Sequence, residues 1–241
     1  MGSSTATDDG LSPKLKARIA GALWLFVIAA GLFAEVFVRS GLIVRGDAAA
    51  TAARIAASEP LYRLGFAADL AGAAAYAGVS LLLYDLLRPV SRSLSLVALG
   101  FGLAGSTVMA ANLVNMYAPL ILIGAGGPNA LILVFARLHG VGYNISMLFF
   151  AVQVSFLGWL VLRSTFVPRI LGILLLVEGA CSLVHCFGLF LDLGFIDRFD
   201  TWILLPGLFA EGGMTLWLLV MGVDERKWRD QPQRSERRVA A

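Results

Sequence analysis

The feature that most constrains the fold is a series of six apolar runs, each long enough to cross a bilayer. A helix needs ~20 residues to span the ~30 Å hydrocarbon core. The runs occupy 19–38, 61–87, 94–122, 141–162, 170–191 and 201–223. The chain has 241 residues, of which 59% are hydrophobic and only 15% are charged, whereas soluble domains have ~25% charged residues. The pattern predicts an all-α polytopic membrane protein, a bundle of six transmembrane helices in a lipid bilayer.

The segments outside these runs divide the chain into three parts. Residues 1–17 are polar and then basic, which predicts a flexible cytoplasmic tail, and 224–241 predict a basic cytoplasmic tail. Residues 18–223 form the transmembrane domain. Short interfacial helices are expected on the outer side: one after Asp47, a good N-cap residue, and one that precedes the fourth run.

The basic residues indicate the orientation. With the N-terminus inside, 13 of the 19 Lys and Arg residues fall in cytoplasmic segments, as the positive-inside rule requires. Both termini are therefore expected in the cytoplasm. The basic residues lie in short loops instead of along one polar face, so no nucleic-acid partner is expected. No pattern indicates an oligomeric state.

Several polar side chains interrupt the apolar runs or their outer edges. A charged group in hydrocarbon is costly, so it usually faces a pocket or has a partner. On the predicted topology these groups gather between the midplane and the outer side. The ligand-pocket candidates are Asp69, Asn112, Asn115, Arg137, His139, Tyr143, Asn144 and Glu211.

The position of each residue in its span gives its depth in the membrane, and candidates at similar depth are expected to contact one another. Asp69 is expected to form an ion pair with Arg137, with Glu211 deeper in the same network. Glu35 and Arg39, four residues apart, are expected to pair at the membrane interface. Small residues between 61 and 87 predict close helix packing there. The leading hypothesis is an outward-facing polar pocket that binds or passes a small molecule or lipid.

Two other functions remain open from the sequence. The polar groups could only hold the bundle together, in a structural or regulatory membrane partner without a ligand. An intramembrane metal-dependent hydrolase would use His139, His185 and either Asp69 or Glu211 as ligands. No H-E-x-x-H spacing or phosphate-binding loop occurs, so an enzyme is not favoured and no metal or cofactor is expected.

Several short motifs follow one another along the chain. They are ARIAG at 17–21, SGLIV at 40–44, LYRLGF at 61–66, LYDLLRPV at 83–90, HGVGYN at 139–144, and RS at 163–164 with VPRILG at 167–172. In this order and spacing they resemble a family of bacterial integral membrane proteins, domain of unknown function 4386. The resemblance implies a multi-span protein of the bacterial inner membrane. It carries no established activity and therefore implies no catalytic residues.

Overall fold

Long helices make up most of the computed structural model, which describes residues 11–194 and 196–239. Within these residues, six helical segments are long and apolar enough to cross a membrane, which confirms the predicted all-α, six-span class. They comprise α1 (Pro13–Phe33) with its continuations η1 (Ala34–Arg39) and α2 (Ser40–Leu42), α4 (Glu59–Leu87), α5 (Arg92–Gly124), α6 (Asn129–Arg163), α7 (Arg169–Phe190) and α8 (Ile196–Val220).

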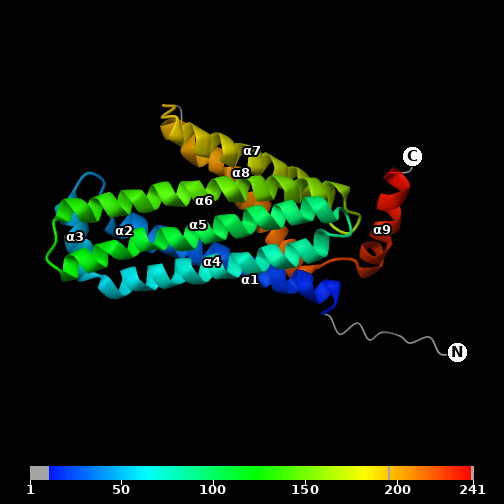
Figure 1. The fold of residues 1–241 in the computed structure, drawn as a ribbon, viewed down its shortest axis with the longest axis horizontal. Coiled ribbons are helices and arrows are strands. Elements are labelled where there is room, and N and C mark those ends of the chain that lie inside the picture. Colours follow the sequence, from blue (N-terminus) through cyan, green and yellow to red (C-terminus); the bar gives the residue numbers. More distant parts are fainter. Residues whose placement is uncertain (1–10, 195, 240–241) are drawn as a thin grey trace.

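The six spanning helices form a ring. Each helix packs against the next in the order α1, α4, α5, α6, α7 and α8, and α8 returns to pack against α1. Short connections make neighbours in the chain neighbours in space. Two shorter helices lie at opposite ends of the bundle (Figure 1): α3 (Ala48–Ala57) and α9 (Glu225–Val239). We call these the α3 end and the α9 end.

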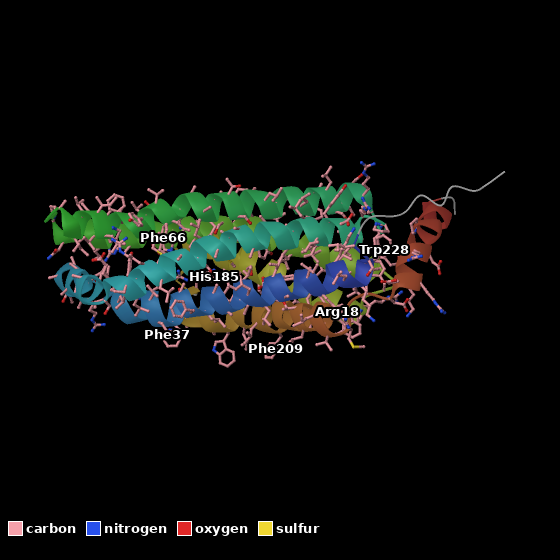
Figure 2. All side chains as sticks on the ribbon, turned by 90° about the horizontal axis from the view of Figure 1, so that it is seen from below. Arg18, Phe37, Phe66, His185, Phe209 and Trp228 are labelled. Carbon is pink, nitrogen blue, oxygen red and sulfur yellow. The ribbon has the colours of Figure 1, made fainter. Side chains whose placement is uncertain are left out.

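The surface of the bundle is strongly apolar. Phe37 and Phe209 are each about 60% exposed and project from the helices (Figure 2). Trp202 and Val114 are exposed to a similar degree. A soluble monomer rarely exposes so much contiguous apolar surface. The exposed side chains therefore fit contact with lipid, and the chain is a multi-pass membrane protein.

The short helix α3 begins as the sequence predicts. The Asp47 side chain caps it by accepting a hydrogen bond from the Ala50 backbone N–H at 2.9 Å. Its buried face carries Ile55, which packs with Tyr62, Leu113 and Ile132. These contacts hold α3 against the ends of α5 and α6.

The fourth span differs from the prediction. No separate interfacial helix precedes it, because α6 is one continuous helix of 35 residues. At 1.5 Å per residue such a helix is ~52 Å long, well beyond the hydrocarbon core. No proline interrupts it, and α3 packs against it. Arg137 and His139 therefore lie within α6 itself.

The two predicted tails are partly helical. Helix α1 begins at Pro13, where the Ser12 hydroxyl accepts from the Leu15 backbone N–H, whereas residues 1–10 lie outside the described residues. Residues 225–239 form α9, and 240–241 again lie outside. The Trp228 indole N–H donates to the Leu86 carbonyl at 2.8 Å. This bond fastens α9 to the end of the bundle.

Two cores fill the interior. One, toward the α9 end, includes Trp24, Leu83, Leu160, Leu175 and Met214. The other, toward the α3 end, is the cluster around Ile55 and Tyr62. A partly open cavity lies between the two cores. On α1, α4 and α6 it is lined by residues between the two core clusters.

Candidate functional site

The cavity between the two cores has a volume of about 330 Å³. Its walls come from the spanning helices other than α7, and most of the side chains that line it are apolar. The polar or titratable residues among them are Glu35, Asp69, Tyr76, Tyr143 and Glu211. Three of the eight sequence candidates, Asp69, Tyr143 and Glu211, thus line one space.

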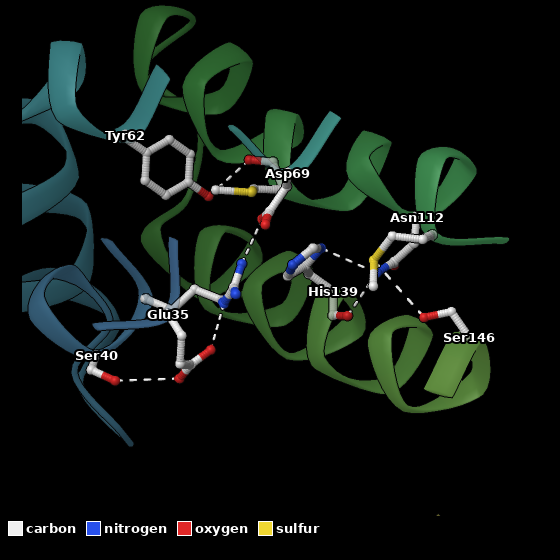
Figure 3. A network of polar contacts seen from close by, with 10 residues as sticks. Glu35, Ser40, Tyr62, Asp69, Asn112, His139 and Ser146 are labelled. Carbon is white, nitrogen blue, oxygen red and sulfur yellow. Dashed lines mark hydrogen bonds and ion pairs between the residues drawn. The ribbon is translucent and has the colours of Figure 1, made fainter. Parts of the chain in front are cut away.

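The end of the cavity nearer α3 carries an ion-pair network. Arg39 Nη1 lies 2.5 Å from Asp69 Oδ2, and Arg39 Nε lies 2.6 Å from Glu35 Oε2 (Figure 3). The side chains of Arg39 and Asp69 are only 13% and 9% exposed. The guanidinium also lies over the Tyr143 ring, 5.7 Å from its centre. One cation is therefore shared by two carboxylates and an aromatic face.

A π-helical turn, η1, carries both Glu35 and Arg39. The Ser40 backbone N–H bonds to the Glu35 carbonyl, five residues back, where an α-helix would use four. The wider turn adds a residue to the helix and changes which side chains after it face inward. Such turns recur at functional sites. Here the turn coincides with the arginine that reaches Asp69.

The ion pair predicted between Asp69 and Arg137 does not form. Asp69 pairs with Arg39, while Arg137 is exposed on α6. Among the described residues, Arg137 has no ion pair. Since α6 starts at Asn129 and runs on without a break, Arg137 lies on its outward face. The predicted pair of Glu35 with Arg39 is present, and Arg39 also pairs with Asp69. The spacing of Glu35 and Arg39 therefore identified the arginine of this network, although not its second partner.

Three other candidates meet between α5 and α6, beside the cavity. Asn112 Nδ2 donates to the His139 carbonyl at 2.8 Å and lies 3.1 Å from His139 Nδ1 (Figure 3). Asn115 Nδ2 donates to Asn112 Oδ1 at 3.0 Å. His139 is buried, and its Nε2 has no hydrogen-bond partner. Asn144 instead bonds to the Gly140 carbonyl of its own helix. These contacts tie α5 to α6.

The opposite end of the cavity is lined by Glu211, which lies near a second acidic side chain, Glu178, that the sequence analysis did not pair with it. Glu211 on α8 and Glu178 on α7 interact electrostatically, and the Trp24 indole lies near Glu211. The Glu178 carboxyl group packs against α8, where a Cβ added at Gly207, one turn before Glu211, would lie 3.6 Å from Glu178 Oε1. Glu178 is 7% exposed, and its Oε2 has no hydrogen-bond partner. Glu211 therefore joins Glu178 instead of the network of Asp69.

The predicted metal ligands are not assembled. Within residues 11–194 and 196–239, no group of three His, Cys, Asp or Glu side chains could hold one metal ion. A catalytic zinc needs three protein ligands. The set of His139, His185 and either Asp69 or Glu211 is therefore not gathered at one point.

Of the comparisons with known proteins, one gives a match, and it includes most of the chain. A family model described as "Domain of unknown function (DUF4386)" matches residues 19–222. The match runs from α1 into the segment after α8 and so includes every residue that lines the cavity. No curated protein and no solved structure matches the chain.

Proposed function

Since the chain belongs to this family of unknown function (DUF4386), no activity comes from its relatives, and we propose from the geometry that it binds a small amphiphile in the cavity. The ligand is a small molecule or part of a lipid. Its apolar body would lie against the side chains of α1, α4, α5 and α6, and its polar group would lie at one of the two charged ends.

The observation that carries this proposal is an unfilled space between two well-packed cores. Protein interiors are close-packed, with few voids larger than a water molecule. A volume of about 330 Å³ lies at the lower end of the range of small-molecule sites, ~300–1,000 Å³. An apolar wall with a few convergent polar groups is the usual composition of such sites.

Small residues keep the space open. Gly31, Ala68, Gly72 and Ala73 all line it. A Cβ added at Gly31 would meet no atom within 4 Å. A larger side chain at Gly31 would therefore extend into the cavity without a clash at the backbone.

The setting of the site is part of the proposal. The family resemblance favours a bacterial inner membrane, and the distribution of Lys and Arg supports an orientation with both termini in the cytoplasm. The end of the cavity that carries Arg39 would then lie toward the outer leaflet. The pocket would be open to molecules that arrive from that side or from the membrane.

The test uses 1-octanol that carries a photoreactive diazirine. Irradiation of the purified protein should label peptides that contain Met109 and Met147, which line the cavity. Gly31→Phe should remove most of this labelling because the phenyl group of the new side chain would occupy the cavity.

Gly100→Phe is the matched control. Gly100 is also a helical glycine with nothing within 4 Å, but it is exposed on α5 and does not line the cavity. Its labelling should equal that of the unchanged protein. If the probe labels only outward residues such as Val114, or labels Gly31→Phe equally at Met109 and Met147, the cavity is not a binding site.

A further inference from the structure

We propose that Glu178 and Glu211 form a cation-exchange site, where the ammonium group of an amphiphilic amine binds in place of a proton. This inference rests on the proposed function and names the ligand class of the same cavity. The site lies at the end away from Arg39.

The first support is the position of the two carboxyl groups. They come from neighbouring helices, α7 and α8. Glu178 Oε1 lies 3.6 Å from the position of a Cβ added at Gly207, one turn before Glu211, so the two carboxyl groups lie on the same side of α8. Glu211 lines the cavity, so a ligand in the cavity can reach it. Glu178 is more than nine-tenths buried, and its Oε2 has no hydrogen-bond partner. A buried acceptor without a donor is costly, and a donor supplied by a ligand would satisfy it.

The second support is the missing positive charge. Among the described residues, no Arg or Lys side chain forms an ion pair with Glu178 or Glu211. Two phenols on other helices interact electrostatically with these carboxyl groups: Tyr76 on α4 with both, and Tyr143 on α6 with Glu211. From α1, the Trp24 indole lies near Glu211. Arg39, at the other end of the cavity, is already bound to Glu35 and Asp69.

Two buried carboxylates side by side cannot both be ionised without a cation, because like charges repel and burial removes their hydration. The empty site therefore holds a proton between them. When an ammonium group enters, one carboxylic acid gives its proton to water, and the resulting carboxylate pairs with the ammonium. No covalent bond to carbon forms or breaks. The buried net charge is the same before and after the exchange.

The surroundings favour an organic ammonium over a metal ion. The Tyr76 ring lies between the rings of Trp24 and Phe150, with centres at 6.2 and 4.6 Å. Aromatic rings attract organic cations through their faces. The rest of the wall is apolar and suits an alkyl chain. A site with only two carboxyl groups lacks the six or more oxygen ligands that Ca²⁺ takes.

The test compares two photoreactive probes of equal length, diazirine-bearing octylamine and diazirine-bearing octanol. Octylamine is a cation at pH 7. A hydrogen bond to a charged group is worth enough to raise occupancy about tenfold or more. Octylamine should therefore label the peptides of Met109 and Met147 at about one-tenth of the concentration that octanol needs.

Glu178→Gln and Glu211→Gln should each abolish this preference, so that octylamine and octanol label the variant at similar concentrations. Thermal unfolding of each variant in detergent shows that it is folded. The control is Glu59→Gln, which makes the same change at a carboxyl group half exposed at the α3 end and paired with Arg63. Glu59→Gln should keep the full preference for octylamine.

A second measurement uses the unchanged protein and so does not depend on any variant. Unlabelled octylamine, added at pH 7 to weakly buffered protein with a pH-sensitive dye, should release about one proton per cavity filled, and octanol should release none. Equal labelling by the two probes, with no proton release, would overturn the exchange site while the cavity remains a binding site. If neither probe labels the cavity, the proposed function itself fails.

The ammonium group can come from a free amine or from an ethanolamine lipid, and competition separates these sources. Octylamine labelling is compared in nanodiscs of phosphatidylcholine with and without phosphatidylethanolamine. Reduced labelling with phosphatidylethanolamine would assign the site to a lipid headgroup. Unchanged labelling, with the preference for octylamine intact, would assign it to a free amine.

Discussion

At the scale of single residues, the choice of partner for Asp69 decides how one end of the cavity is built. Arg39 and Arg137 both lie toward the α3 end, yet only Arg39 faces inward. Its guanidinium has enough donors to serve Glu35 and Asp69 together. The pair with Asp69 is largely buried, so its loss should matter much more than the loss of an exposed contact.

We expect Arg39→Ala to lower the free energy of unfolding by about 3–5 kcal/mol, because Asp69 would remain buried without its cation. The double change Arg39→Ala with Asp69→Ala should cost less than the sum of the two single changes. Unfolding in mixed micelles, followed by tryptophan fluorescence, measures these differences.

Arg137→Ala is the matched control, since it removes an exposed arginine from the same end of the bundle. It should change the free energy of unfolding by less than ~0.5 kcal/mol. Additive effects of the Arg39 and Asp69 changes, or an equal cost at Arg137, would contradict the observed pairing.

At the scale of helices, the contact between α6 and α7 depends on two glycines. A Cβ added at Gly158 would lie 2.8 Å from the Gly172 carbonyl oxygen, and a Cβ at Gly172 would lie 2.8 Å from the Gly158 carbonyl oxygen. Small residues at such contacts let helix backbones approach closely in membranes. This close approach fixes the position of α7, and with it Glu178, next to α6 within the ring of helices.

Gly158→Ala should therefore destabilise the protein, by about 1–3 kcal/mol, because the methyl group forces the backbones apart. At Gly100 the same change meets open space. There it should be neutral or stabilising by up to ~1 kcal/mol, since alanine favours a helix. Thermal unfolding of both variants in one detergent gives the comparison. Similar shifts at the two positions would show that α6 and α7 are not in close contact at Gly158.

At the scale of the whole molecule, the ring of six helices leaves a space in its middle with a different charge arrangement at each end. One end has a cation shared by two carboxylates, and near the other lie two carboxyl groups that form no ion pair with an Arg or Lys side chain that the structure describes. The proposed orientation places the Arg39 end outward. It also places the turn between α5 and α6 outside and the start of α9 inside.

Cysteine labelling tests this orientation. We expect Ala125→Cys, in the exposed turn after α5, to react with a membrane-impermeant maleimide on intact cells. Arg226→Cys, exposed in α9, should react only after the cells are opened. The unchanged protein, whose Cys186 is buried and Cys181 partly buried, measures the background. Reaction of Arg226→Cys on intact cells would reverse the proposed topology.

The sequence by itself determined the number and class of the helices and several of their ends. Length and hydropathy predict six spans, because ~20 apolar residues in lipid must satisfy their backbone hydrogen bonds within one helix. The cap at Asp47 and the pair of Glu35 with Arg39 are local interactions, three and four residues apart. Both could therefore be predicted from neighbouring residues alone.

Only the tertiary structure decided which side of each helix faces inward. Gly72 lines the cavity while Ala71 is exposed, and Arg39 reaches Asp69 while Arg137 does not. In a soluble helix the alternation of polar and apolar residues reveals the buried side. In a membrane, lipid and the helix interior are almost equally apolar, so this signal is lost. Glu178 and Glu211 meet only because α7 and α8 pack as they do.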